Sequence, residues 1–180
     1  MTTNPLDETL SEAGGITLTT RGGLTLKLRP VTPDDAPALA VLFEELAVED
    51  MRFRFLSGRE HLSPDQLAAM TGVDHRHSEH LLAFESTTSR LVASLLIAAD
   101  AHMETAEVAI AIAADFKGRG IGWTLLRHAA ELARERGICR LRSIESRANH
   151  QALEVERALG FKTCDYDGDA TLVLVEAELD

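Results

Sequence analysis

The sequence has little positive charge, no long hydrophobic run and few cysteines. Its 18 Lys and Arg residues against 29 Asp and Glu residues leave a net charge of −11. That balance argues against nucleic-acid binding, which requires a basic face, and is compatible with a cationic amine or a lysine-bearing partner protein. No apolar run approaches the roughly 18–20 residues of a membrane span. Because the N-terminus also lacks a signal pattern, we expect a cytoplasmic protein that binds no membrane.

The two cysteines, Cys139 and Cys164, lie in predicted strands. We expect them to be small buried hydrophobes in a reduced protein. The 180 residues suit one domain with a substantial core. We expect residues 1–15 to be disordered and residues 16–180 to form that domain.

Strand and helix patterns alternate in the second half of the chain, from about residue 106 onward. This order predicts a mixed α/β sheet with some parallel pairing. Apolar periodicity, caps and turns together predict strands over 16–20, 24–29, 80–86, 91–99, 106–113, 140–145, 162–166 and 171–178. The same signals predict four helices, over about 33–47, 63–72, 120–136 and 149–160.

A glycine-rich loop between a predicted strand and a predicted helix carries the strongest functional signal. It reads Lys117-Gly118-Arg119-Gly120-Ile121-Gly122. Glycines at alternate positions allow a tight turn with several N–H groups facing one concavity, and the helix start adds about half a positive charge. The spacing is neither that of a P-loop nor that of a dinucleotide-binding loop. It predicts a diphosphate site, with Lys117 and Arg119 available for further phosphate contacts.

Lys117-x-x-Gly120-x-Gly122 resembles motif A of the GNAT N-acetyltransferases, with Lys in place of the usual Gln or Arg. Asn149, Ala152 and Leu159-Gly160-Phe161 resemble motif B of the same family. The resemblance covers about residues 24–178. It implies a single GNAT-like domain, whose mostly antiparallel sheet contains one splayed parallel pair and is flanked by about four helices. It also implies acetyl-CoA as cosubstrate.

The N-terminal half resembles one branch more narrowly, the acetyltransferase domain of bacterial protein lysine acetyltransferases. The similar segments are Leu28-Arg29-Pro30-Val31, Asp34-Asp35 and residues 49–55. The branch implies a protein lysine as acceptor. A small amine, such as a polyamine, an amino acid or an antibiotic-like compound, would use the same chemistry, and a non-catalytic acetyl-CoA sensor is a third reading. Either a monomer or a homodimer fits.

Glu107 is the candidate general base. An alkylammonium has a pKa near 10.4, so an acyl-transfer enzyme benefits from a carboxylate that removes the amine proton. Strand alternation places Glu107 on one face with Ala109 and Ala111, which suggests a carboxylate at the head of a small-residue groove where burial would raise its pKa. The resemblance assigns the base to this position. A solvated glutamate at a strand end is the alternative.

The resemblance also implies which residues hold acetyl-CoA. Backbone groups at the splay would bond the pantetheine and polarise the thioester, and Asn149 either caps its helix, bonds the cofactor, or does both. The expected cofactor-binding residues are Ile112, Ala113, Ala114, Lys117, Gly118, Arg119, Gly120, Ile121, Gly122, Trp123 and Asn149.

The position of the general acid differs from the family pattern. Many GNAT enzymes place a tyrosine seven residues after the asparagine of motif B, and here that residue is Glu156. The single tyrosine of the chain, Tyr166, falls in a later predicted strand. The resemblance therefore leaves the acid unassigned.

Two further clusters have competing readings. His75, His77 and His80 could ligate a metal, line the substrate pocket or lie in a solvated loop, and we expect no metal. Phe53 and Phe55 are either core anchors, the reading we prefer, or part of the acceptor site.

Overall fold

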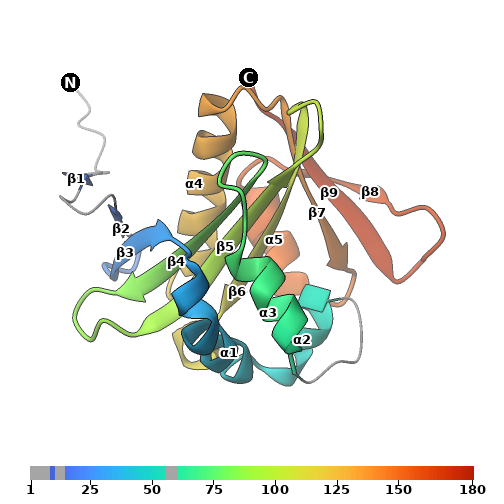
Figure 1. Ribbon diagram of the computed structural model, residues 1–180. Helices are drawn as coiled ribbons and strands as arrows, with labels where there is room; N and C mark the ends of the chain where they lie inside the picture. The colour runs from blue at the N-terminus through green and yellow to red at the C-terminus, as the bar shows by residue number, and fades with distance from the viewer. Residues whose placement is uncertain (1–8, 11–14, 56–60) are drawn as a thin grey trace.

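One mixed β-sheet organises the computed structural model, which describes residues 9–10, 15–55 and 61–180 (Figure 1). Over this part of the chain the sheet has nine strands in the order β1-β2-β3-β4-β5-β6-β7-β9-β8. All neighbours are antiparallel except β6 and β7, which are parallel. The predicted mixed, mostly antiparallel sheet with one parallel pair is confirmed. The strands are β1 (Thr9–Leu10), β2 (Ile16–Thr19), β3 (Thr25–Pro30), β4 (Ser78–Glu85), β5 (Leu91–Ala99), β6 (Thr105–Ile112), β7 (Arg140–Ser146), β8 (Lys162–Asp165) and β9 (Leu172–Glu178).

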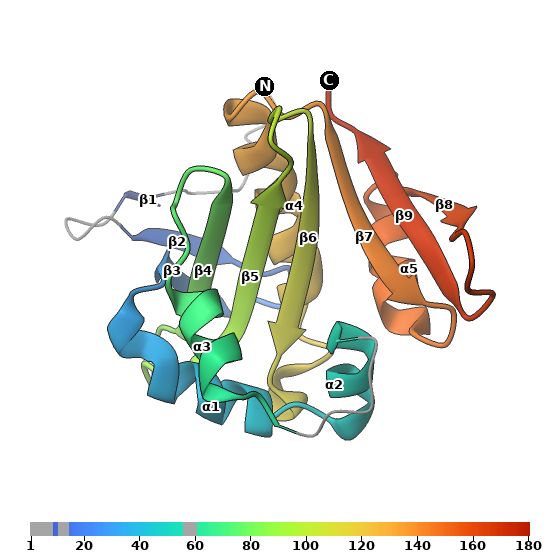
Figure 2. The same cartoon turned by 45° about the vertical axis from the view of Figure 1, so that its right-hand side comes forward.

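Helices cover both faces of the sheet (Figure 2). α1, α2 and α3 lie on one face, and α4 and α5 lie on the other. Short 3-10 turns, η1 (Pro33–Asp35) and η2 (Ala114–Phe116), precede α1 and the glycine loop. The α-helices of the described residues are α1 (Ala36–Glu44), α2 (Val48–Phe55), α3 (Pro64–Thr71), α4 (Ile121–Glu135) and α5 (His150–Ala158).

The fifth helix, α2, is missing from the sequence prediction. The first predicted helix was expected to continue to residue 47, but α1 ends at Glu44 and a new helix begins at Val48. Acidic residues in the first turn of α2 and arginines in its last turn match the helix dipole. Such a charge pattern stabilises a short helix that apolar periodicity alone does not reveal.

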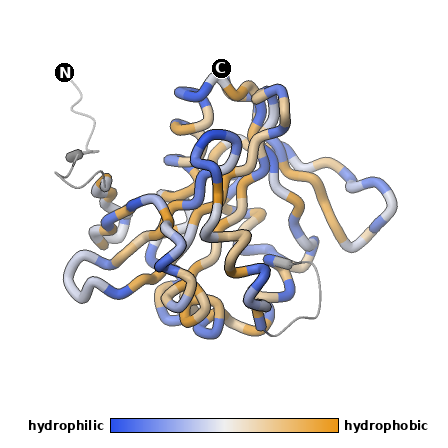
Figure 3. Tube along the Cα trace, viewed as in Figure 1, coloured by the Kyte–Doolittle hydropathy of each residue, from blue (hydrophilic) through white to orange (hydrophobic). Residues whose placement is uncertain are grey.

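The core lies between the central strands and the helices. Leu82 of β4, Leu95 of β5 and Leu125 of α4 are almost fully buried. α4 buries one stripe, in which Leu125, Ala129 and Ala133 recur at helical spacing. The hydropathy colouring shows the same separation, with apolar central strands and hydrophilic turns (Figure 3).

β6 and β7 separate part-way along their length. Three residue pairs join them, Thr105 with Arg140, Ala106 with Leu141 and Glu107 with Arg142. Beyond Glu107 the two strands share no further pair in the described chain, and the ribbons diverge toward the glycine loop (Figure 2). The splay leaves one edge of each strand without a strand partner.

The prediction that both cysteines are buried is wrong: Cys139 and Cys164 are exposed, because Cys139 precedes β7 and β8 is exposed along its whole length. The expected disordered N-terminus falls mainly on residues outside the described ranges, but Thr9–Leu10 form β1 and pair with β2. Across the described residues, no helix combines the length and the apolar character that a membrane span demands.

Candidate active site

A cavity of about 250 Å³ lies where β6 and β7 diverge. Its walls come from β6, β7, α2, α5 and the glycine loop with the start of α4. Of the residues expected to bind acetyl-CoA, the cavity is lined by Ile112, Lys117, Gly118, Gly120, Ile121, Gly122, Trp123 and Asn149. Arg119, Ala113 and Ala114 are not among its lining residues.

Left-handed glycines shape the loop in front of α4. Gly118 and Gly120 have φ values of +74° and +80°, a region that other residues enter only with strain. Gly120 is the N-cap of α4, so the N–H groups of the next residues are not bonded within the helix and face the loop. A helix start of this kind suits an anion such as a diphosphate.

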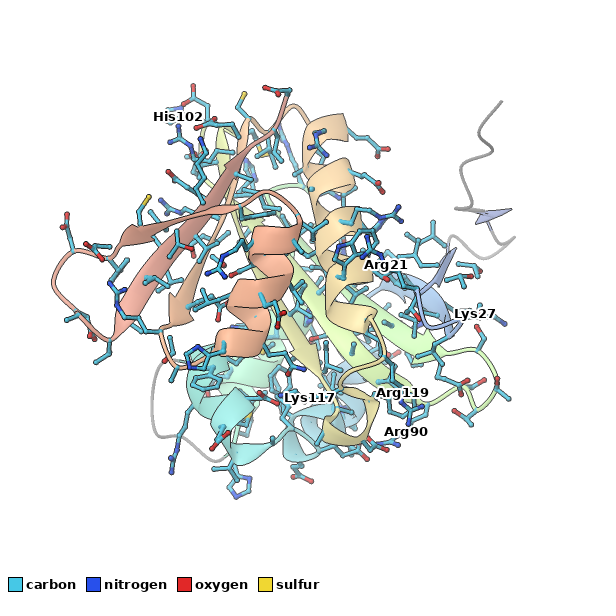
Figure 4. The ribbon with its side chains drawn as sticks, turned by 180° about the vertical axis from the view of Figure 1, so that it is seen from behind. Arg21, Lys27, Arg90, His102, Lys117 and Arg119 are labelled. Carbon is cyan, nitrogen blue, oxygen red and sulfur yellow. The ribbon has the colours of Figure 1, made fainter. Side chains whose placement is uncertain are left out.

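The basic side chains of the loop have acidic or carbonyl partners. Lys117 Nζ lies 2.8 Å from both carboxylate oxygens of Asp50 in α2. Arg119 donates to the backbone oxygen of Asp115, and Arg90 donates to the Asp115 carboxylate. Figure 4 shows Lys117, Arg119 and Arg90 near the start of α4, with Arg21 beside the helix and His102 at the opposite end of the molecule. Three basic side chains therefore lie near the expected diphosphate, and Asp50, Asp115 and Glu45 pair with two of them.

Ala113 and Ala114 use their N–H groups within the protein. The Ala113 N–H donates to the oxygen of Val92, and the Ala114 N–H donates to the oxygen of Glu45. The free donors that the splay was expected to supply at these two positions are therefore already bonded. The cavity is bordered instead by β6 residues 108–112, which precede them.

Asn149 and Trp123 border the cavity from two helices. The Asn149 Oδ1 accepts from the Ala152 N–H at the start of α5, so its predicted role as a helix cap is confirmed. Its Nδ2 donates to Glu145 at 2.9 Å. The guanidinium of Arg21, from the turn between β2 and β3, lies 3.6 Å from the centre of the Trp123 ring. This contact joins the first turn of α4 to the N-terminal strands.

Glu107 lies on β6 at the last residue pair before the splay. Its side chain is 51% exposed and its carboxylate accepts from Arg142 at 2.8 Å. It is not one of the described residues that line the cavity, so the burial expected for this carboxylate is wrong. The β-sheet instead places Glu107 at an open position paired with an arginine.

Two acids that the site prediction omitted do line the cavity. Burial raises the pKa of Glu145 in β7 to about 7, against the opposing effects of Asn149 and Arg54. Burial, together with repulsion from Glu145, raises the pKa of Glu156 in α5 to about 8. A sequence signal existed for Glu156, because it shares the apolar face of its helix with Ala152, Val155 and Leu159.

Comparison with known proteins identifies the family. The model of the acetyltransferase (GNAT) family matches residues 42–161, two thirds of the chain. This protein belongs to the GNAT family. It is therefore an acetyl-CoA-dependent N-acyltransferase that acts on an amine.

Individual relatives agree with this assignment. Acetyltransferase PA5475 of Pseudomonas aeruginosa is 29% identical over 154 residues, covering 84% of this chain and 83% of the relative. The crystal structure of the GNAT domain of S. lividans PAT is 28% identical with a TM-score of 0.83, covering 92% of this chain and 97% of that domain. Spermidine N-acetyltransferase from Vibrio cholerae shares the fold, with a TM-score of 0.71, 16% identity and coverage of 86% of this chain and 95% of that one.

The residues of this GNAT domain fit acetyl-CoA. The loop leaves unobstructed space at Gly118, where an added Cβ would meet nothing within 4 Å, and backbone can approach a phosphate there. The cavity continues from this loop between the diverging strands. The diphosphate and the pantetheine of acetyl-CoA can therefore be held by one continuous surface.

The histidines of this GNAT domain have separate partners. His75 bonds Glu79, His77 bonds Asp74, and His80 bonds the backbone oxygen of Met70. His80 belongs to β4 and is fully buried, so the solvated-loop reading is wrong for it. In the described ranges no group of three or more potential ligands is arranged to hold a metal ion.

The structure places one of the two aromatic residues of α2, Phe53. Phe53 is partly buried and lines the cavity, which agrees with the alternative that this segment borders the site. The side chain of Phe55 lies outside the described part of the structure.

Proposed function

We propose that this GNAT protein transfers the acetyl group of acetyl-CoA to the side-chain amine of a protein lysine. The observation that carries the proposal is the likeness to the GNAT domain of S. lividans PAT, which extends over 97% of that domain at 28% identity. The net charge of −11 favours a cationic acceptor and agrees with a lysine-bearing partner. We expect the protein to act in the cytoplasm, as a monomer or a homodimer.

Acetyl transfer here requires a neutral amine beside a thioester. Lys117, the loop glycines and the start of α4 would hold the diphosphate of acetyl-CoA, and β6 and β7 would flank its pantetheine. One cleft holds both substrates close together and in the right orientation. This proximity accounts for a large part of the rate acceleration of acyl transfer. The amine nitrogen then attacks the thioester carbonyl directly, with no acyl-enzyme step.

Glu107 is proposed as the general base of this reaction. It lies at the head of the splay, and its exposed carboxylate is open to an acceptor that arrives from solvent. A carboxylate in this place accepts the amine proton, directly or through one water. Arg142 donates a hydrogen bond to this carboxylate at 2.8 Å and orients it.

The experiment is an acetylation assay with lysine-containing proteins and peptides beside polyamines and amino acids, read by mass spectrometry. We expect Glu107→Gln to lower kcat at least about tenfold without weakening acetyl-CoA binding. Glu104→Gln, an exposed acid just before β6, is the matched control and should be neutral. A kcat for Glu107→Gln that equals the wild-type value at neutral and at high pH removes Glu107 from this role.

A small amine is the second candidate acceptor. The fold that this chain shares with spermidine N-acetyltransferase and its acidic net charge favour a small cationic amine over a neutral substrate. Turnover of polyamines with no acetylation of any protein lysine would replace the lysine proposal by this one. Binding of acetyl-CoA with no acceptor in either panel would favour a sensor.

A further inference from the structure

An acid cluster lies in the wall of the cavity, formed by the buried Glu156 of α5 with the buried Ser143 and the partly buried Glu145 of β7. Glu156 is 5% exposed, and Ser143 is 4% exposed. Most of the remaining wall is apolar or glycine, an environment in which an ionised carboxyl group is costly to bury. Glu107, the proposed base, does not belong to the cluster.

The two oxygens of Glu156 have different environments. Oε1 accepts a hydrogen bond from the Ser143 hydroxyl. Oε2 is buried and has no hydrogen-bond partner among the described residues. An ionised oxygen in such a position would lose its hydration without compensation, whereas a protonated Oε2 carries a proton that no described protein group accepts.

Charges around the cavity also favour a proton on Glu156. The groups that line the same cavity are Asp50 and Arg54 from α2, Lys117 from the glycine loop, and Glu145 from β7. Lys117 is paired with Asp50, and Arg54 acts electrostatically on Glu145. The charged neighbour whose influence on Glu156 is resolved is Glu145, and it is repulsive. Both burial and charge therefore retain the proton.

We propose that Glu156 is the acid that protonates the sulfur of coenzyme A as it leaves. The inference rests on the acetyl transfer proposed above. The amine nitrogen forms a bond to the carbonyl carbon, the carbon–sulfur bond breaks with its electron pair on sulfur, and the Oε2 proton of Glu156 moves to that sulfur. The amine proton goes to the base, and solvent returns a proton to Glu156.

A proton donor matters here because the leaving group forms away from bulk water. A thiol has a pKa near 8.5 in water, so a thiolate is a tolerable leaving group there. Burial among apolar groups raises that pKa and makes an unprotonated departure slower. The chain's tyrosine cannot supply the proton, because Tyr166 is exposed and does not line the cavity.

The test combines Glu156→Gln with the pH dependence of kcat. Glutamine keeps the shape and the bond from Ser143 but has no acidic proton. We expect kcat to fall at least about tenfold while the Kd of acetyl-CoA stays within about twofold. We expect the wild-type kcat to fall as pH rises through about 8, and that alkaline limb should vanish in Glu156→Gln.

Two further variants separate acid catalysis from packing. Glu154→Gln, on the exposed side of the same helix, should retain the wild-type rate and profile. Glu145 acts as a positioning residue, because its charge opposes ionisation of Glu156. Glu145→Gln should therefore move the alkaline limb to lower pH.

A spectroscopic readout tests the proton itself and needs no acceptor. The infrared spectrum of the wild type should contain the carbonyl band of a protonated carboxyl group that titrates at about pH 8 and is absent from Glu156→Gln, whereas the band of Glu145, which titrates at about pH 7, should remain in that variant. A wild-type spectrum without such a titrating band overturns the inference even if the variant does not fold. So does an unchanged alkaline limb in Glu156→Gln.

Failure of the proposed function has a different signature. A protein that acetylates no amine, yet retains the band, loses the proposed function together with the acid role of Glu156. An active wild type matched by Glu156→Gln at every pH refutes the acid alone and leaves the transferase function intact.

Discussion

Gly120 shows how one residue type determines the phosphate end of the site. Its φ of +80° ends the loop and begins α4, and a Cβ there would lie 3.6 Å from the Arg21 nitrogen. An L-residue in this left-handed region is strained by roughly 1–2 kcal/mol. The alternate glycines were readable in the sequence because this backbone requirement is local.

Gly120→Ala should weaken acetyl-CoA binding at least about tenfold and lower stability by about 1 kcal/mol, because the loop can no longer hold its turn at the helix start. Gly168→Ala is the control, since Gly168 has a φ of +93° with open space around it and does not line the cavity. It should lose similar stability with no loss of binding. Calorimetric titration and thermal unfolding measure both quantities, and equal affinities in the two variants would contradict the role of the loop.

The acidic residues of the cavity could not be predicted from the sequence as the glycines of the loop could. The sequence pointed to Glu107, yet the fold leaves that side chain half exposed beside Arg142, whereas Glu156 is buried and Glu145 partly buried in the wall of the cavity. Which carboxyl group is desolvated depends on the helix that packs over it. The residues next to a carboxyl group in the sequence do not predict which helix that is.

At the scale of elements, helix α2 is the part of the site that the sequence did not predict. Its Asp50 reaches across to Lys117 of the glycine loop, 67 residues further along the chain. The prediction assigned Lys117 to phosphate with no competing partner. Pairing between segments so distant in sequence arises only when the sheet brings them together.

Asp50→Asn should tighten acetyl-CoA binding by about two- to fivefold, because it frees Lys117 and removes a negative charge near the expected phosphates. The gain should shrink as salt screens the charges. Glu49→Gln, an exposed acid of the same helix, should leave the affinity unchanged. Fluorescence of Trp123, which lines the cavity and is the chain's one tryptophan, is a direct binding signal. Weaker binding by Asp50→Asn would mean that the ion pair supports the loop.

For the whole molecule, the buried acids make stability depend on pH. The folded pKa values of Glu145 and Glu156, about 7 and about 8, lie above their ordinary value of 4.5. Between about pH 4.5 and pH 8 the folded state therefore binds more protons than the unfolded state, and stability falls as pH rises. Asp35, with a pKa lowered to about 2, contributes its full stability throughout this window and loses it only in acid.

We expect the unfolding temperature to decrease by several degrees between pH 5 and pH 8, since about 1 kcal/mol corresponds to roughly 2–4 °C at this size. A variant with both Glu145→Gln and Glu156→Gln should flatten this decrease, and Glu154→Gln should keep it. Thermal unfolding in buffers of matched ionic strength measures the slope. An unfolding temperature that rises from pH 5 to pH 8 would contradict burial of the pair.

The sequence by itself determined eight of the nine described strands, four of the five described α-helices, the glycine loop and the family resemblance, because apolar periodicity, caps and positive-φ turns depend on near neighbours. Tertiary structure decided the rest: the exposure of Cys139 and Cys164, the separate helix α2, the Lys117–Asp50 pair and the desolvation of Glu145 and Glu156. Exposure and desolvation depend on what packs against a side chain from distant parts of the chain. In this protein the divergence of β6 from β7, covered by α2 and α5, creates that environment.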